Sequence, residues 1–497
     1  MSAAQNVVFD KELAPAAPAT RLRGTALVEW AVLGALVLAW AWFSYGYIED
    51  DAFIHLEFAR SVASGLGFAF GGTVTNGDTA PLWVLFITFF HFFGVEWVVG
   101  AKLACTAGLA LSVSGAWRLA RDLPRERPVH DLLPFFAVAL TLLNPYFVHW
   151  SFSGMEATAA LGLSMWVVWA VFLGTLTAPR ALFGASLLAV GPLLRPELLV
   201  FAALVAPALL WRFWHAQGTR SPAFRLVWGA ALGMVMLLPL CIWCGYALHA
   251  FGSLVPNTNM AKRGGAIGAI ASRLIPVYLM GFPVTLLLLP FACAWGMWRR
   301  HTPAAVLALL LWPTACVAFY LANHTVVQTR YCLLSMPCMT IGVLWLLGRI
   351  APPRLFAGAA AAMLLASVFV IVSIVIPHVR NKEQLREQFA AVSEFIRHNV
   401  PAREPVAVFA IGQLEFESRH PLVDLGGITQ PQIVPYLNDS AAALRWAKAR
   451  GARYFAGNSS PEAGAEPVFD VTVPYIGWTL QRALYRGTQS YSVYRLP

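Results

Sequence analysis

Residues 30–55 read WAVLGALVLAWAWFSYGYIEDDAFIH and join two contrasting kinds of sequence. The first part belongs to an apolar run long enough to cross a bilayer, since a spanning helix needs about 20 apolar residues. The second part places three carboxylates, Glu49, Asp50 and Asp51, directly after that run. Charged side chains at a membrane edge cost free energy and mark functional sites. The stretch therefore predicts a membrane helix that delivers acidic residues to one face of the membrane.

The composition extends this interpretation to the whole chain. Of its 497 residues, 58% are hydrophobic and 12% are charged, and the mean hydropathy is +0.63. A soluble domain carries roughly 25% charged residues and about 45–50% apolar ones, so soluble and disordered chains are excluded. The net charge of +10 does not indicate a nucleic-acid binder, because the Lys and Arg residues lie in short loops between apolar runs. The composition is that of a polytopic membrane protein.

The apolar runs predict 11 membrane spans. The stretch 181–211 is interrupted by Leu194-Arg195-Pro196-Glu197 and is counted as two short helices. The run 82–95 is short and is predicted to lie in the outer interface. If it spanned, the Arg-rich loop 118–127 would face outward, against the positive-inside rule. The nine uninterrupted spans are 24–45, 101–120, 132–150, 157–177, 226–250, 274–298, 303–322, 331–348 and 355–377.

The two halves of the chain contribute opposite charges to the outer face. No acidic residue occurs between Glu197 and Glu383, so the second half supplies only cations there. We expect a site with carboxylates at one end and cations at the other, which suits an uncharged reacting group attached to a phosphate. The outward acidic residues are Glu49, Asp50, Asp51, Glu57, Asp78, Glu96, Glu156 and Glu197, and the outward cations are Arg60, Lys102, Arg195, Lys262, Arg263, Arg273 and Arg330.

The chain divides into three parts. A cytoplasmic tail (1–23) precedes an all-α membrane domain (24–377) whose outer loop, 46–98, carries the acidic motif. A small α/β domain (378–497) follows outside the membrane. In this last part the pattern predicts an amphipathic helix at 382–398, strands at 406–411, 421–425 and 453–455, and a helix at 441–450. No cleaved signal peptide is expected, because the first span is itself the insertion signal.

The paired aspartates allow two interpretations. Adjacent acids raise the pKa of one of them, which suits a general base or a metal ligand. Alternatively, Asp50 and Asp51 complement the dipole of the helix that follows. His55 lies four residues after Asp51 and is either a metal ligand or a polar interface residue. These three side chains allow a divalent cation without requiring one, so the cofactor stays unassigned.

The order of motifs resembles the GT-C superfamily of polyprenyl-phosphate-sugar-dependent glycosyltransferases. The most similar branch includes the terminal arabinofuranosyltransferase of the mycobacterial cell wall and pilin arabinosyltransferases. The motifs that carry the resemblance are Asp50-Asp51-Ala52-Phe53-Ile54, Thr79-Ala80-Pro81-Leu82-Trp83, Ser153-Gly154-Met155-Glu156, Leu194-Arg195-Pro196-Glu197, Gly252 to Thr258 with Lys262 beyond, Arg330-Tyr331 with Pro337, and Val423-Asp424-Leu425-Gly426-Gly427-Ile428.

The resemblance implies roles for the outward residues. Asp50 is expected to be the base that deprotonates the acceptor, and Asp51 to orient the acceptor or hold a divalent cation. The donor phosphate would be bound by Lys262 and Arg330, with Asn257 as a hydrogen-bond donor and Arg263 as a further cation. The other implied substrate-binding residues are His55, Glu156, Arg195 and Glu197; the alternative for the two glutamates is ion pairing with Arg195 or Arg60.

The resemblance also implies the partners and the compartment. A polyprenyl-phosphate-linked sugar would be the donor, and an extracytoplasmic glycan, lipid or protein the acceptor, at a bacterial cytoplasmic membrane. Arabinofuranose is the expected sugar, and mannose or another hexose stays open. A lipid-sugar flippase or transporter is a second hypothesis, but such proteins keep polar groups near the midplane and often show internal repeats. A non-catalytic scaffold is the third, and it would not need eight outward carboxylates.

Overall fold

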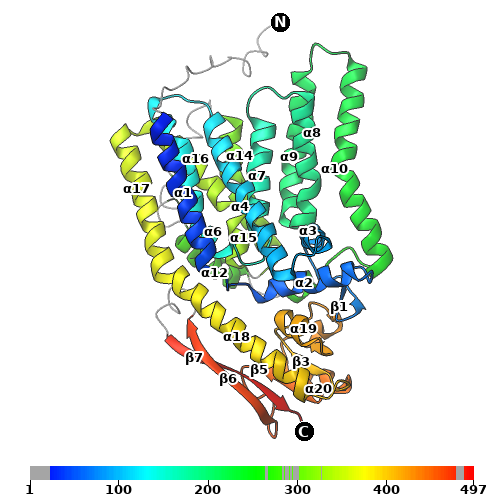
Figure 1. Ribbon diagram of the computed structural model, residues 1–497. Helices are drawn as coiled ribbons and strands as arrows, with labels where there is room; N and C mark the ends of the chain where they lie inside the picture. The colour runs from blue at the N-terminus through cyan, green and yellow to red at the C-terminus, as the bar shows by residue number, and fades with distance from the viewer. Residues whose placement is uncertain are drawn as a thin grey trace.

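The computed structural model describes residues 23–262, 267–281, 285, 290, 294, 302–325, 327–476 and 486–497. It shows a bundle of helices with a five-stranded sheet at one end (Figure 1). The first 22 residues of the predicted cytoplasmic tail, Arg263, and most of the second half of the predicted span 274–298 lie outside the described residues.

The described part of the chain confirms a multi-pass membrane protein. Six helical stretches are long and apolar enough to cross a bilayer: Trp97–Asp122, Glu197–Ala216, Pro222–Phe251, Ala304–Ala322, Thr329–Ile350 and Pro353–Asn399. Shorter apolar helices correspond to the predicted spans 24–45, 132–150 and 157–177 and to the first short helix of 181–211, and the count of 11 stays a prediction. The bundle helices are α1 (Arg23–Phe43), α4 (Trp97–Asp122), α5 (Leu133–Leu142), α6 (Pro145–Trp150), α7 (Ala157–Phe172), α8 (Ala178–Leu194), α9 (Glu197–Ala216), α10 (Pro222–Phe251), α12 (Ile267–Gly281), α14 (Ala304–Ala322), α15 (Thr329–Leu333), α16 (Met336–Ile350) and α17 (Pro353–Val370).

Two predicted spans are wrong as single helices. The span 132–150 is divided into α5 and α6 at Asn144-Pro145, where the Asn144 side chain accepts hydrogen bonds from the N–H groups of Tyr146 and Phe147. This capping ends one helix and starts the next, and proline fits the first turn because its missing N–H has no helical partner there. The span 331–348 is also divided, into α15 and α16, where Pro337 lies in the first turn of α16 and the N-cap residue Ser335 makes no side-chain capping bond.

The predicted domain boundary near residue 377 lies within a continuous helix. α17 continues through a π-helical turn, η2 (Ile371–Val375), into α18 (Ile376–Asn399). The amphipathic helix predicted at 382–398 is therefore the distal part of one continuous helix. Pro377 lies directly after the π-helical turn, and π-helical turns relieve local disruptions of the helical hydrogen-bond ladder. Because the chain does not break here, the bundle and the C-terminal domain share a rigid element.

The C-terminal α/β domain is confirmed, with several elements that the sequence pattern did not predict. Its sheet has the order β4-β3-β5-β7-β6, in which β3 pairs in parallel with β4 and β5, and β7 pairs antiparallel with β5 and β6. The long strands β6 and β7 are the largest unpredicted part, and α18 lies against them (Figure 1). The elements are β3 (Val406–Val408), α19 (Gly412–Ser418), β4 (Leu422–Asp424), η3 (Pro431–Tyr436), α20 (Ser440–Ala449), β5 (Tyr454–Gly457), β6 (Glu466–Ile476) and β7 (Arg486–Arg495).

The outer loop forms its own layer between the bundle and the C-terminal domain (Figure 1). It comprises α2 (Asp50–Ala63), the short strands β1 (Ala69–Phe70) and β2 (Thr73–Val74), and α3 (Pro81–Phe92). α3 corresponds to the run predicted to lie in the interface. A further short helix, α11 (Asn257–Lys262), follows α10. This layer contains the acidic motif, so its position decides where the site lies.

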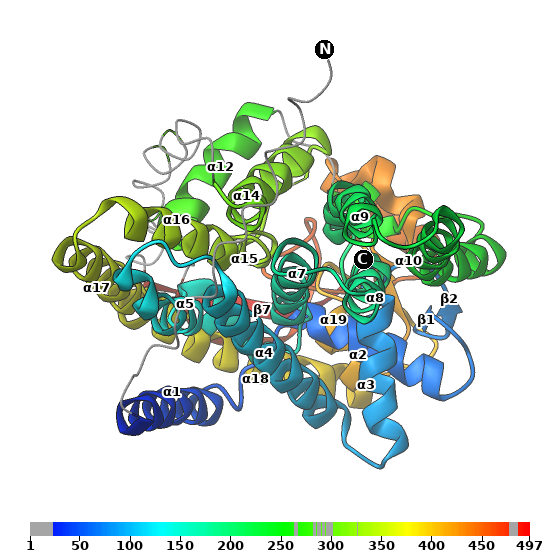
Figure 2. The same ribbon diagram turned by 90° about the horizontal axis from the view of Figure 1, so that it is seen from above.

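The centre of the bundle is α7, which the other helices surround (Figure 2). Its close approach to α4 requires glycine. A Cβ atom on Gly108 would stand 2.9 Å from the Ala159 nitrogen, and one on Gly162 would stand 2.6 Å from the Ser112 nitrogen. Small residues let helix backbones approach closely where packing, rather than water exclusion, drives association. The α4–α7 contact therefore fixes the helix whose first residue follows Glu156.

We expect Gly162→Ala to destabilise the protein by about 1–3 kcal/mol, the usual cost of overpacking a filled interface. The measurement is unfolding of the purified protein in detergent. Gly229→Ala is the matched control, because a Cβ there meets nothing within 4 Å. Equal effects of the two substitutions would contradict the packing argument.

Candidate active site

The acidic motif forms the first turn of α2. Glu49 is the N-cap residue, and Asp50 and Asp51 lie in the first turn, where carboxylates complement the helix dipole. Helical spacing places His55 on the same face as Asp51. Asp51 and His55 both line a cavity at the end of the bundle that faces the C-terminal domain.

The turn that precedes Glu156 packs closely against α2. Gly154 has a φ of +87°, and a Cβ there would lie 2.7 Å from the Cβ of Ala52, so glycine is required twice over. The indole N–H of Trp83 on α3 donates a hydrogen bond to the Gly154 carbonyl oxygen at 2.9 Å. Between them, α2 and α3 hold this turn so that Glu156 lies beside His55.

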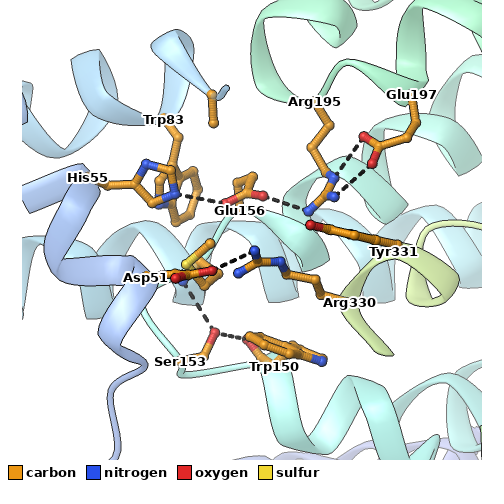
Figure 3. A network of polar contacts seen from close by, with 12 residues as sticks. Asp51, His55, Trp83, Trp150, Ser153, Glu156, Arg195, Glu197, Arg330 and Tyr331 are labelled. Atoms are coloured by element: carbon orange, nitrogen blue, oxygen red, sulfur yellow. Dashed lines mark hydrogen bonds and ion pairs between the residues drawn. The ribbon is translucent and has the colours of Figure 1, made fainter. Parts of the chain in front are cut away.

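His55 lies between the carboxylates of Asp78 and Glu156, and its contact with Glu156 is drawn in Figure 3. Its Nδ1 is 2.5 Å from an oxygen of Asp78, and its Nε2 is 3.3 Å from an oxygen of Glu156. Burial acts to lower the pKa of His55, but the carboxylates of Asp78 and Glu156 outweigh burial and raise the pKa to about 10. The ring is therefore an imidazolium at neutral pH, in which both nitrogens are donors and neither offers a lone pair to a metal ion.

Arg195 joins Glu156 to Glu197 (Figure 3). Its guanidinium donates to Glu156 at 2.7 Å and to both carboxylate oxygens of Glu197 at 2.9 and 3.1 Å. The Tyr320 hydroxyl donates to the same Glu197 carboxylate at 2.9 Å. Burial acts to raise the pKa of Glu156, but Arg195 and His55 lower it to about 2. The structure thus contains the ion pairing of both glutamates with Arg195, whereas Arg60 pairs with Glu57.

Asp51 faces the cations of the second half of the chain. A guanidinium N–H of Arg330, on α15, donates to the Asp51 carboxylate at 2.6 Å. Burial acts to raise the pKa of Asp51, but Arg330 and Lys262 outweigh it and hold the pKa below its usual range. The Lys262 ammonium, at the end of α11, lies 3.4 Å from the Tyr331 hydroxyl. Among the cavity-lining cations that the structure describes, Lys262 makes no ion pair with a carboxylate.

The side chains of Asp50 and Asn257 do not line the cavity. One carboxylate oxygen of Asp50 accepts from the Gln413 backbone N–H at 2.8 Å, at the start of α19, and burial raises the Asp50 pKa to about 6. The Asn257 amide donates to the Thr75 hydroxyl at 3.1 Å. Of the sequence-predicted set, the residues that line the cavity are Asp51, His55, Glu156, Arg195, Glu197, Lys262 and Arg330.

Asp50, Asp51 and His55, which the sequence analysis considered for a divalent cation, do not converge. Asp50 is bonded to α19 and Asp51 to Arg330, while His55 is enclosed by carboxylates. A cation bound by all three would require these contacts to break.

The expected separation of charge into two ends is wrong. Carboxylates and cations alternate around the cavity, because buried charges are stable only when they are paired. The lining carboxylates are Asp51, Asp78, Glu156 and Glu197, and the lining cationic groups are His55, Arg195, Lys262 and Arg330.

The lining residues that were not among the predicted site residues include Asp78, Thr258, Tyr320 and Ile428. Asp78 was counted as an outward acid, and its place in Asn76-Gly77-Asp78-Thr79 could have marked it as a site residue. Tyr320 lies in an apolar run and has no sequence signal. Ile428 comes from the C-terminal domain, in the loop where Thr429 accepts a hydrogen bond from Thr75 at 2.9 Å. This domain therefore forms part of the cavity wall.

Three solved structures are similar to this chain over most of its length. A solved structure of ArnT from Cupriavidus metallidurans in the apo state has a TM-score of 0.58 at 12% identity, and covers 94% of this chain and 98% of that chain. ArnT from Cupriavidus metallidurans bound to undecaprenyl phosphate has a TM-score of 0.57 at 14% identity, with 95% and 98% coverage. The arabinofuranosyltransferase AftD from mycobacteria has a TM-score of 0.50 at 16% identity; this chain is covered to 92%, but only 41% of AftD is matched.

This chain has the GT-C fold. The fold implied by the sequence motifs is thereby confirmed. A domain of unknown function (DUF8728) matches residues 377–494, which is the C-terminal domain together with α18. No curated protein sequence matches the chain.

The raised pKa of His55 predicts a pH-dependent stability. Its ion pairs stabilise the folded protein fully below the unfolded pKa of about 6.5, and this contribution declines with rising pH until it is lost above about 10. The difference in melting temperature between wild type and His55→Gln should therefore shrink between pH 6.5 and 10.5. The exposed His398, replaced by Gln, serves as the control. A difference that does not change over this range would contradict the assignment of a buried imidazolium.

Proposed function

We propose that this protein is an integral-membrane glycosyltransferase that moves a sugar from a polyprenyl-phosphate carrier to an acceptor outside the cytoplasm. The observation that carries the proposal is a cavity lined by the Asp51 carboxylate and by two hydrogen-bond donors that lack a partner in the described part of the chain. These donors are the Nε of Arg330 and the Thr258 hydroxyl. The GT-C fold supports the proposal, as does the neighbour bound to undecaprenyl phosphate. The enzyme class rests on this combination of fold and site.

The donor phosphate would bind on the side of Lys262 and Arg330. Apart from the ion-paired His55 Nε2 and Glu156 Oε2, two buried polar atoms of lining residues have no hydrogen-bond partner in the described part of the chain: the Thr258 hydroxyl and the Nε of Arg330. Buried donors without partners cost free energy, and an anion that accepts from them recovers it. Lys262 adds a cation that no carboxylate neutralises. A phosphate placed here would satisfy all three groups.

Asp51 is the proposed general base. It is the aspartate of the pair that lines the cavity, whereas Asp50 is bonded to α19. In the reaction the acceptor oxygen bonds to the anomeric carbon as the bond from that carbon to the phosphate oxygen breaks. The acceptor proton passes to the Asp51 carboxylate, and the polyprenyl phosphate leaves with the electron pair. The donor phosphate competes with Asp51 for Arg330, so donor binding would free the carboxylate to accept the proton.

The acceptor would approach from the C-terminal domain, which contributes Ile428 to the cavity wall. We place this domain (378–497) and the outer loop (46–98) outside the cytoplasmic membrane of a bacterium, with the N-terminal tail in the cytoplasm. The protein is then a multi-pass enzyme of the cell envelope, and the acceptor is a glycan, lipid or protein of that compartment. Arabinofuranose is the first sugar to test, followed by mannose and other hexoses.

The first test is sugar transfer by the purified protein in detergent. Labelled polyprenyl-phosphate sugars, arabinofuranose and mannose included, are the donors, and crude envelope is the acceptor. We expect Asp51→Asn to lower kcat by about 10²- to 10⁴-fold, the usual contribution of a general base. Asp50→Asn should retain most activity, since its carboxylate does not line the cavity.

Three results separate the alternatives. Loss of transfer in Asp50→Asn with retention in Asp51→Asn would move the base to Asp50. Retention in both folded variants would contradict base catalysis by the acidic motif. Turnover of no donor by the folded wild-type protein would contradict the proposed function and favour a lipid-sugar flippase.

Phosphate binding predicts a different kinetic signature for Lys262. We expect Lys262→Gln to raise KM for the donor roughly 10-fold, because a charge-assisted hydrogen bond contributes about 1.5–3 kcal/mol. Its kcat should fall much less than that of Asp51→Asn. Measuring both constants at saturating acceptor checks this, and an unchanged KM would place the phosphate elsewhere.

A further inference from the structure

A second cluster of ligating side chains lies apart from the cavity. Glu49, His149 and His378 are all buried, and each offers one ligand atom such that these atoms lie within 4.8 Å of one another. Glu49 precedes α2, His149 lies on α6, and His378 lies on α18. None of the three lines the cavity of the proposed active site.

The geometry of this cluster is close to that of a metal centre. The Oε1 of Glu49 and the Nε2 of His149 are 3.7 Å apart. Two donors at about 2.0–2.1 Å from a tetrahedral Zn²⁺ ion stand roughly 3.4 Å apart. The Tyr47 hydroxyl lies beside both atoms, at 3.0 Å from Glu49 Oε1 and 2.8 Å from His149 Nε2, so the three atoms form a triangle. An ion would therefore need only a small adjustment of these side chains.

The donor atoms of the cluster suit a divalent transition metal. The other oxygen of Glu49 accepts from the Lys382 ammonium at 2.9 Å, so Lys382 does not block Oε1. The rings of His149 and His378 pack edge to face, with centroids 5.2 Å apart. Imidazole nitrogens with one carboxylate oxygen form a ligand set typical of Zn²⁺, whereas Mg²⁺ and Ca²⁺ prefer oxygen ligands alone.

The helix geometry around His378 gives a separate argument. The π-helical turn η2 ends three residues before His378. An extra residue in one turn rotates the following side chains by about 100° relative to an uninterrupted α-helix. His378 is directed toward Glu49 and His149 as a result of this rotation, and π-helical turns are frequent at functional sites.

We propose that Glu49, His149 and His378 bind a divalent transition-metal ion, with Zn²⁺ as the best-matched ion and the Tyr47 oxygen within reach as a fourth donor. The ion would join the start of α2 to α6 and to α18. Since α18 continues into the C-terminal domain and Asp51 lies two residues after Glu49, the ion would fix that domain relative to the acidic motif. The site is structural and does not depend on the proposed glycosyltransferase function.

The test uses the full-length protein in detergent. Protein stripped with a chelator is loaded with Zn²⁺ or Co²⁺ and passed through gel filtration. Metal content is then measured by mass spectrometry, the Co²⁺ absorption spectrum recorded, and the melting temperature determined. We expect wild type to retain a stoichiometric amount of Zn²⁺, to melt at a higher temperature when loaded, and to show the spectrum of a tetrahedral Co²⁺ site.

Substitutions locate the ion. His378→Gln should weaken Zn²⁺ binding by at least about 100-fold, since even loss of an outer-shell partner costs about 10- to 100-fold. Two variants should bind as wild type does: His398→Gln, which removes an exposed histidine of the same helix, and Asp51→Asn, which removes a carboxylate of the cavity.

Three outcomes would overturn the proposal. The first is a wild-type protein that retains no metal and gives no Co²⁺ spectrum. The second is a folded His378→Gln that binds Zn²⁺ as tightly as wild type. The third is loss of the ion in Asp51→Asn rather than in His378→Gln. If His378→Gln fails to fold, the wild-type cobalt spectrum and melting temperature decide.

Discussion

The site depends on one buried carboxylate, Glu156, which pairs with His55 on one side and Arg195 on the other. His55 belongs to α2, Glu156 precedes the central helix α7, and Arg195 lies between α8 and α9. Removing one partner of a buried ion pair leaves an uncompensated charge, which costs several kcal/mol. Three parts of the chain that are distant in sequence are therefore held in one arrangement by the requirement that every buried charge be paired.

That requirement explains why the cavity is charged and yet balanced. Lys262 is the lining cation with no carboxylate partner in the described part of the chain, and it lies on the same side as Arg330. The site thus provides positive potential at one place rather than over the whole cavity. A phosphate group would be bound there, while the reacting sugar would lie near the ion pairs that Glu156 makes with His55 and Arg195. Such preorganised charges stabilise a developing charge without reorganisation.

Much of the fold could be predicted from the sequence, because apolar length, the positive-inside rule and the Leu194-Arg195-Pro196-Glu197 interruption are local signals. The breaks within 132–150 and 331–348 were missed, since Asn144-Pro145 lies inside an apolar run that hydropathy alone does not divide. The cavity residues were predicted largely from motifs. Tyr320 and Ile428 could not be, because they reach the site only through tertiary packing. The sequence also does not distinguish Asp50 from Asp51: they are adjacent, and only the position of α19 directs Asp50 away from the cavity.

The contact between Asp51 and Arg330 then has a consequence for the order of binding. While the pair is intact, Arg330 holds the pKa of Asp51 low, and a carboxylate with a low pKa is a weak base. A donor phosphate that takes over the guanidinium removes this effect, so the basicity of Asp51 rises only after the donor has bound. The acceptor would therefore meet an active base only in the presence of the donor. In this arrangement the arginine that would bind the phosphate would also suppress proton abstraction before the donor is bound.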